Sequence, residues 1–180
     1  MFARLSVIFT GAMLAATGAA SAQEPLVWTT IDCAASHLAP VEGTACLSTA
    51  VVSGGVAAGG RGQRHMLRGT TALGSVVVVM SEALDDLAYV MTLKNTVDFL
   101  KLLDRRAADA SAWSDAAFHG TAEYFTFRSG DGDRCVGLRR LGANRSLGYA
   151  WMIHAILCAA SGQALQPGQI VQFIDSVRRP

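Results

Sequence analysis

Four cysteines restrict the folds open to this chain of 180 residues more than any other feature of its sequence. They are Cys33, Cys46, Cys135 and Cys158. In an exported protein an even number of cysteines is typical of disulfide bonds, because the compartments outside the cytoplasm are oxidising. Four cysteines permit three connectivities, and we predict the two local bonds, Cys33–Cys46 and Cys135–Cys158. Each closes a short loop, and such a bond is worth about 3 kcal/mol in the chain-entropy model.

The first residues of the chain predict that the protein is exported, and export is the condition under which these disulfides are expected. Arg4 supplies a short positive region, Leu5–Ala16 is an apolar run, and Ala20–Ala22 has the small-x-small pattern of a signal-peptide cleavage site. The apolar run is shorter than the ~20 residues that span a bilayer. We therefore predict a cleaved signal peptide at residues 1–22 and a single domain at residues 23–180. An uncleaved N-terminal anchor is the alternative.

The balance of charge excludes two classes of partner. The full chain has 15 Lys and Arg against 14 Asp and Glu, and loss of Arg4 with the signal peptide would make the two equal. A nucleic-acid-binding protein should present a basic surplus on one face, and a balanced chain is not drawn to anionic lipid. We expect no nucleic-acid partner and no membrane span after signal cleavage. The remaining expectation is an unknown protein or small-molecule partner in the envelope.

The C-terminal third predicts three antiparallel strands and a helix. Two segments of alternating hydrophobicity surround a turn at Ser129–Asp133, as in a β-hairpin. Tyr149–Cys158 then returns as a third strand, and Pro167 stands near the start of a last helix. The apolar stripe of that helix consists of Ile170, Phe173, Ile174 and Val177.

The middle of the chain predicts one buried strand followed by helix. The segment "SVVVVM", Ser75–Met80, is apolar on both faces, as expected of a central strand. Ser81 and Asn95 look like N-caps, and helical spacing predicts two helices or one bent helix over residues 82–109. The segment "LAYVMTL", Leu87–Leu93, could instead be a strand.

The region before this strand has little apolar periodicity. Residues 26–52 predict a loop-rich element stapled by the Cys33–Cys46 disulfide, and the glycine-rich residues 53–62 predict a flexible loop. We therefore predict an α+β fold: an antiparallel β-sheet, made of the C-terminal three-stranded meander and the Val76 strand, with helices packed on one face and disulfides stabilising it.

His154 and Cys158 invite a reading as a catalytic pair, which strand geometry excludes. Four residues apart on a strand, they share a face but lie about 13 Å apart along it. A thiolate–imidazole pair needs a separation of about 3 Å, so we expect Cys158 to be a structural disulfide cysteine.

The remaining chemistry-bearing residues match no known motif. His37, His65, His119 and His154 are scattered, without the spacing of a zinc site. Asp115 and His119, four residues apart, could share a helix face, and we expect a surface pair. We predict no catalytic, cofactor-binding or metal-binding residues and no cofactor. Clustered aromatic residues are expected to pack in the core; they are Trp113, Phe118, Tyr124 and Phe127.

One resemblance covers about the last 60 residues. The segments "EYFTFRSGDGDRCVGLRR" and "GYAWMIHAILCAASGQALQPGQIVQFIDSVR" are similar to small exported proteins of Gram-negative, especially alphaproteobacterial, origin. In these proteins a strand cysteine is followed by a Gly-Tyr strand with a second cysteine, a small-residue turn and a helix. The motif is structural, and no activity is known for the group.

These observations predict a periplasmic or secreted protein that acts through binding without enzymatic activity, in association with the cell envelope. A periplasmic hydrolase is the alternative, since residues distant in sequence can converge in the fold. Its site would be sought first at Asp115, His119 and His154. A thiol-active protein is the third hypothesis.

Overall fold

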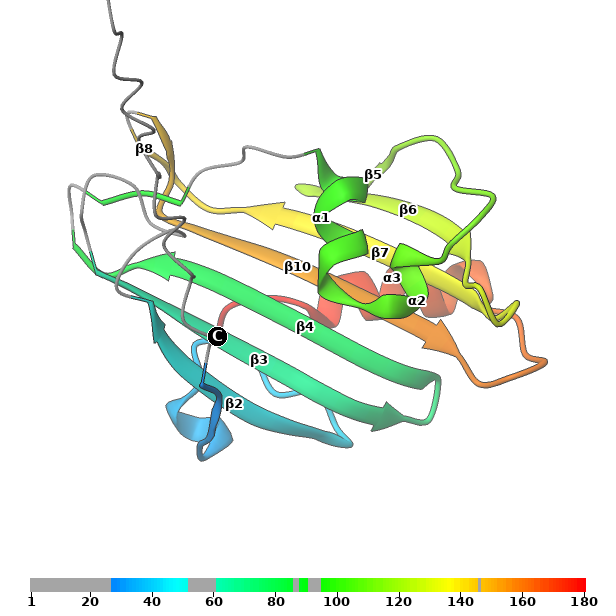
Figure 1. Cartoon of the computed structure of the whole chain (residues 1–180), viewed down its shortest axis with the longest axis horizontal. Helices are drawn as coiled ribbons and strands as arrows, with labels where there is room; N and C mark the ends of the chain where they lie inside the picture. Colours follow the sequence, from blue (N-terminus) through cyan, green and yellow to red (C-terminus); the bar gives the residue numbers. More distant parts are fainter. Residues whose placement is uncertain (1–26, 52–60, 86–87, 91–94, 146) are drawn as a thin grey trace, which may run out of the picture.

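The computed structural model describes residues 27–51, 61–85, 88–90, 95–145 and 147–180 (Figure 1). The predicted signal peptide and most of the glycine-rich segment lie outside these residues. The described chain is built on an eight-stranded antiparallel sheet with the order β1-β2-β3-β4-β10-β7-β6-β5. A separate two-stranded sheet joins β8 to β9.

The strands of the large sheet are β1 (Thr29–Thr30), β2 (Thr44–Val51), β3 (Gly62–Thr71), β4 (Gly74–Ala83), β5 (Ala117–His119), β6 (Ala122–Arg128), β7 (Arg134–Leu141) and β10 (Trp151–Ala159). The small sheet has β8 (Asn144–Arg145) and β9 (Gly148–Tyr149). The helices are the 3-10 helix η1 (Cys33–Ala35) and the α-helices α1 (Thr96–Leu103), α2 (Arg105–Ala108) and α3 (Pro167–Ser176). Within the described residues, no helix is both long and apolar enough to cross a bilayer.

Strands β4 and β10 form the centre of the sheet. They pair with each other from Gly74–Ala159 to Glu82–Trp151. Both strands are apolar at successive positions, and both faces must therefore be covered. The predicted meander is present as β6, β7 and β10, with the Val76 strand beside β10. An antiparallel sheet with helices and two disulfides therefore agrees with the α+β prediction.

The helices cover both faces of the sheet, whereas the sequence predicted one face. Helices α1 and α2 lie in front of the sheet in Figure 1 and α3 lies behind it. On the α1 face, Leu100 and Ala107 pack with Val77 and Ile156; on the opposite face, Phe173 and Ile174 pack with Val78 and its neighbours. The physical reason is the alternation of β4 and β10, which sends apolar side chains to both sides.

The helix predicted over residues 82–109 is shorter than expected. Strand β4 continues through Glu82 and Ala83, because these residues pair with β3 on one side while Glu82 pairs with β10 on the other. The cap at Asn95 is confirmed: its side chain accepts a 2.8 Å hydrogen bond from the Asp98 N–H at the start of α1. Val90 makes a bridge to Tyr149 rather than a helical turn. The predicted helical positions Asp86, Leu87 and Met91 lie outside the described residues.

The N-terminal region contains more strand than the sequence predicted. Residues 44–51, expected to be loop-rich, form β2 and pair with β3 from Thr44–Gly69 to Val51–Gly62. Their mixed composition carries little strand periodicity, and the pairing with β3 supplies the order.

Both predicted disulfides are present. Cys33 on η1 is bonded to Cys46 on β2, and Cys135 is bonded to Cys158, its register partner across β7 and β10. The first bond lies on the α3 face and the second on the α1 face. All four cysteines are thereby oxidised, which leaves no thiol for the third functional hypothesis.

Candidate functional site

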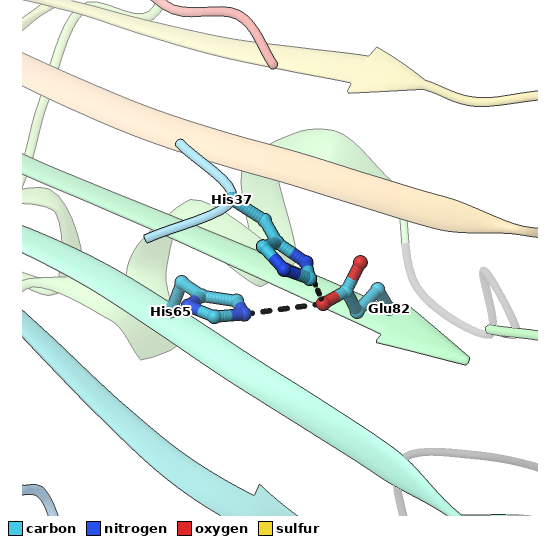
Figure 2. Close-up of side chains that lie close together, drawn as sticks. All are labelled: His37, His65 and Glu82. Carbon is cyan, nitrogen blue, oxygen red and sulfur yellow. Dashed lines mark hydrogen bonds and ion pairs between the residues drawn. The ribbon is translucent and has the colours of Figure 1, made fainter. Parts of the chain in front are cut away.

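Three polar side chains converge on the α3 face, at the end of the sheet where β4 stops and β3 begins. Figure 2 shows the rings of His37 and His65 facing the carboxylate of Glu82. His37 Nδ1 lies 2.6 Å and His65 Nε2 lies 3.1 Å from the same oxygen, Glu82 Oε1. An ionised carboxylate only accepts hydrogen bonds, so both rings donate to it.

The β3–β4 hairpin brings His65 and Glu82 together. Its register pairs Gln63 with Glu82 and His65 with Met80. His65 and Glu82 therefore lie on the same face as diagonal neighbours, within reach of long side chains. Antiparallel pairing on a buried face leaves this register little freedom to slip.

His37 reaches the site from the N-terminal segment that the Cys33–Cys46 disulfide ties to β2. Leu38, the next residue, is 1% exposed and anchors the segment in the core. The segment is also bonded to the C-terminal tail, because the Ala39 N–H donates to the Arg178 carbonyl at 2.9 Å. The ring of His37 stacks on that of His65 with centroids 4.7 Å apart.

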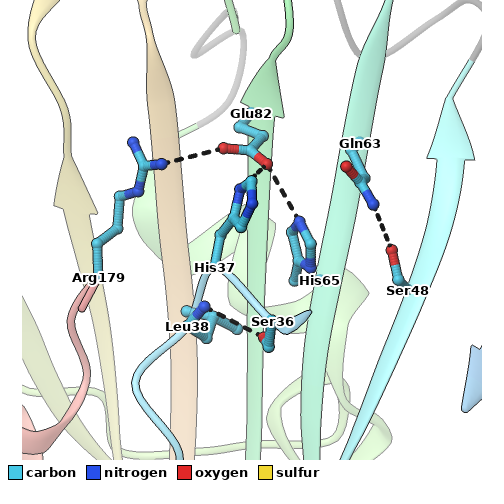
Figure 3. A network of polar contacts seen from close by, with 8 residues as sticks. All are labelled: Ser36, His37, Leu38, Ser48, Gln63, His65, Glu82 and Arg179. Atoms are coloured by element: carbon cyan, nitrogen blue, oxygen red, sulfur yellow. Dashed lines mark hydrogen bonds and ion pairs between the residues drawn. The ribbon is translucent and has the colours of Figure 1, made fainter. Parts of the chain in front are cut away.

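Arg179 contributes a cation to the second oxygen of the carboxylate. Its Nη2 lies 3.4 Å from Glu82 Oε2, and its Cζ lies 5.9 Å from the ring centroid of Trp151. Trp151 is the β10 register partner of Glu82. Figure 3 shows Glu82 between Arg179, from the C-terminal tail, and His37, from the N-terminal segment.

A further hydrogen bond extends this polar end of the face. Gln63 Nε2 donates to Ser48 Oγ at 2.8 Å, beside His65 (Figure 3). Ser48 is the register partner of His65 on β2. Polar side chains from three adjacent strands, β2, β3 and β4, are thus gathered in one region.

The site is buried at its base and open at its rim. The side chains of His65 and Glu82 are 1% and 6% exposed, whereas those of His37 and Arg179 are 48% and 39% exposed. Burial raises the pKa of Glu82, but the hydrogen bonds and the electrostatic interaction with His65 and His37 outweigh it. The net pKa of Glu82 lies below its ordinary value, so the group is a carboxylate at neutral pH.

His65 carries an unmet hydrogen-bonding group. Its Nδ1 is buried and has no partner among the described residues. Packing and the stacking contact with His37 therefore hold this ring, in place of a second hydrogen bond. Buried polar atoms without a partner are uncommon and call for an explanation.

The donor set matches that of a transition-metal site. The two ring nitrogens and the carboxylate oxygen all lie within 4.8 Å of one another. Two imidazoles and one carboxylate form a ligand set that Zn²⁺ takes in catalytic sites, where a fourth position stays open to water or substrate. These three residues can hold one such ion.

The other histidines lie elsewhere. His119 Nε2 is 3.1 Å from Asp175 Oδ1, and Asp115 is not in a helix, so the expected Asp115–His119 pair does not form. His154 lies on the opposite face of β10, stacked on Phe99 with centroids 3.8 Å apart. Neither of these two histidines is close to the His37–His65–Glu82 cluster.

The aromatic residues divide between core and surface. Trp113 stacks on Phe127 with centroids 4.2 Å apart, and Phe127 is 4% exposed, as core packing predicts. Phe118 differs, since it is 70% exposed on the short edge strand β5. A single exposed aromatic side chain is not a binding surface.

The sequence did contain a signal for this cluster, which the helix prediction obscured. If β4 is extended through Glu82, the short connection from Thr71 to Gly74 sets a register that places Glu82 near His65. The Cys33–Cys46 bond then holds the segment that carries His37 against β2, the strand next to β3. The helix predicted over residues 82–109 instead begins at Glu82.

Comparisons with protein families, with curated proteins and with solved structures find no match for this chain. Any functional conclusion therefore depends on the geometry of the site.

Proposed function

We propose that this protein is an exported binding protein of the periplasm or extracellular space, and that its ligand is a divalent transition-metal ion, with Zn²⁺ as the first candidate. The ion is held by His37 Nδ1, His65 Nε2 and Glu82 Oε1. The observation that carries the proposal is the convergence of these three donors on one point from β3, β4 and the disulfide-tied N-terminal segment.

Export is supported by the disulfides and by the N-terminal sequence. Two disulfides in one small domain are typical of proteins outside the cytoplasm. The apolar N-terminal run and its small-x-small motif are those of a signal peptide. The resemblance to exported alphaproteobacterial proteins points to the same compartment.

The chemistry of the donors favours Zn²⁺ or Cu²⁺ over Mg²⁺ or Ca²⁺, because imidazole nitrogen suits the former and the latter prefer oxygen. Metal binding replaces the two ring-to-carboxylate hydrogen bonds. Each ring then carries its proton on the other nitrogen, which is Nε2 of His37 and Nδ1 of His65. The low pKa of Glu82 keeps the third donor deprotonated at neutral pH, as metal binding requires.

The experiment is a titration of Zn²⁺ into the disulfide-bonded, chelator-treated protein, followed by calorimetry and by thermal unfolding. We expect one ion per chain and a rise in Tm with Zn²⁺ concentration. His37→Gln should weaken binding by about 100-fold or more, beyond the ~10–100-fold effect typical of outer-shell changes. His37 is half-exposed, so this variant keeps the fold.

His119→Gln is the matched control, because it removes a histidine that pairs with Asp175 away from the cluster. It should bind Zn²⁺ like the unmodified protein. Equal binding by the His37→Gln variant, or a stoichiometry that falls with His119→Gln, would contradict the assignment of the site.

A second candidate function is a metal-dependent periplasmic hydrolase. One observation favours it: three protein donors leave one zinc position open, as in catalytic sites. Hydrolysis of a p-nitrophenyl ester by the Zn²⁺-loaded protein, lost in His37→Gln and kept in His119→Gln, would support this function over binding alone.

A further inference from the structure

We infer that the metal-loaded site binds a small oxyanion, such as a carboxylate, at the open coordination position, with Arg179 donating hydrogen bonds to it. This inference rests on the proposed metal site. It adds to that proposal the chemical class of a second ligand and a residue that selects it.

The charge of the loaded site favours an anion. Without metal, the negative charge of Glu82 is balanced by the positive charge of Arg179. A divalent ion bound by neutral histidines adds two positive charges that no further protein side chain neutralises. Among the described residues, Glu82 is the one acidic side chain within 4.0 Å of His37, His65 or Arg179. The loaded site therefore carries an excess of positive charge, which attracts an anion.

The number of donors leaves room for a further ligand. Zinc takes four ligands in most protein sites, and this cluster supplies three. Arg179 also has donors to spare, since a guanidinium has five N–H groups and, among the described residues, only its Nη2 forms an ion pair, with Glu82 Oε2. A planar guanidinium beside a metal is suited to bind an oxyanion that also coordinates the ion.

The site is accessible to solvent on one side. His65 and Glu82 are buried at the base of the site, whereas His37 and Arg179 are about half and two-fifths exposed. A ligand from solvent would thus reach the metal on the side where His37 and Arg179 are exposed; Figure 3 shows both side chains beside Glu82. Two contacts hold the tail that carries Arg179: Val177 is 2% exposed in the core, and the Arg178 carbonyl accepts the Ala39 N–H.

The test uses Co²⁺ as a spectroscopic replacement for Zn²⁺ in the disulfide-bonded protein. With the site saturated by Co²⁺, acetate and, separately, phosphate are titrated while the visible absorption of the ion is recorded. We expect a saturable spectral change with at least one of the two anions. Arg179→Gln should weaken that anion's binding by about tenfold or more, as expected for loss of a charge-assisted hydrogen bond.

Arg178→Gln is the matched control, because Arg178 is exposed and adjacent, and its substitution keeps the backbone carbonyl that Ala39 uses. It should leave anion binding unchanged. Measuring at saturating Co²⁺ separates anion affinity from any change in metal affinity.

The outcomes distinguish the two proposals. If Co²⁺ binds and neither anion alters its spectrum, the oxyanion inference is overturned and the metal site stands. If the anions bind equally well to Arg179→Gln, Arg179 is not the selecting residue and the inference is wrong. If Co²⁺ itself does not bind, both the metal proposal and the oxyanion inference fall.

Discussion

His154 should make this protein much less stable at acidic pH, because the folded structure keeps its imidazole neutral. The side chain is 2% exposed on β10 and is stacked on Phe99. Burial, and then the charge of its register partner Arg139, lower its pKa from 6.5 to about 3. The folded protein therefore holds this imidazole neutral at any pH above about 3.

The sign of the effect follows from proton linkage. In the unfolded chain His154 takes up a proton near its ordinary pKa of 6.5, whereas in the folded chain it does so only near 3. Between these two pH values the unfolded state binds more protons than the folded state. The free energy of unfolding therefore falls by about 1.4 kcal/mol for each unit by which the pH is lowered. Above pH 6.5 His154 is neutral in both states, and the protein keeps its full stability with respect to this group. By pH 4.5 the loss is roughly 3 kcal/mol, and in full it reaches roughly 5 kcal/mol.

Such a loss is large beside the roughly 5–15 kcal/mol that stabilises a typical domain. The substitution His154→Phe removes the titrating group and keeps an aromatic ring against Phe99. Urea unfolding of the disulfide-bonded protein at pH 7 and at pH 4.5 measures the effect. The unmodified protein should lose roughly 3 kcal/mol more than His154→Phe between these two pH values.

His119→Phe is the control, since it also removes a histidine, but one that is partly exposed beside Asp175. When the pH-dependent losses in the free energy of unfolding are compared between variants, the contributions of the carboxylates that titrate in all of them cancel. An identical loss in the unmodified protein and in His154→Phe would refute the reasoning, because it would mean that His154 is not held neutral by burial.

Two further predictions concern the disulfides and a turn. Replacing both Cys33 and Cys46 by alanine should weaken Zn²⁺ binding by about tenfold or more, because the segment that carries His37 is then no longer bonded to β2. In the matched control, replacing both Cys135 and Cys158 by alanine should lower the free energy of unfolding by about 3 kcal/mol and leave Zn²⁺ binding unchanged. Equal affinities in the two double variants would contradict this. Gly74→Ala should destabilise the protein by several kcal/mol in urea unfolding, since φ at Gly74 is +139° and a Cβ would overlap the Cys158 carbonyl. Gly168→Ala, with open space around it in α3, should be neutral or stabilising.

The site combines features that a purely structural cluster would not need. A buried carboxylate is costly unless it is paired, and a single arginine would suffice for Glu82. Two additional histidines point at its other oxygen. Metal coordination explains why both rings are aimed at the same point.

The local chemistry of the chain determined much of the fold. Alternation around Ser129–Asp133 predicted the hairpin β6–β7, the valine run predicted the central strand β4, and Asn95 marked the start of α1. These features depend on neighbouring residues and on backbone preferences, which any short window of sequence contains. The disulfides followed from the number of cysteines and from short loop closure.

The tertiary structure alone decided where β4 ends and what its last residues do. Ser81, Glu82 and Ala83 resemble a helix start when they are read in isolation, yet pairing with β3 and β10 makes them strand. The cluster of His37, His65 and Glu82 depends on that register and on a disulfide that spans 13 residues. Contacts between distant segments leave no periodic trace in the chain, which is why the sequence predicted the scaffold and the packing alone assembled the site.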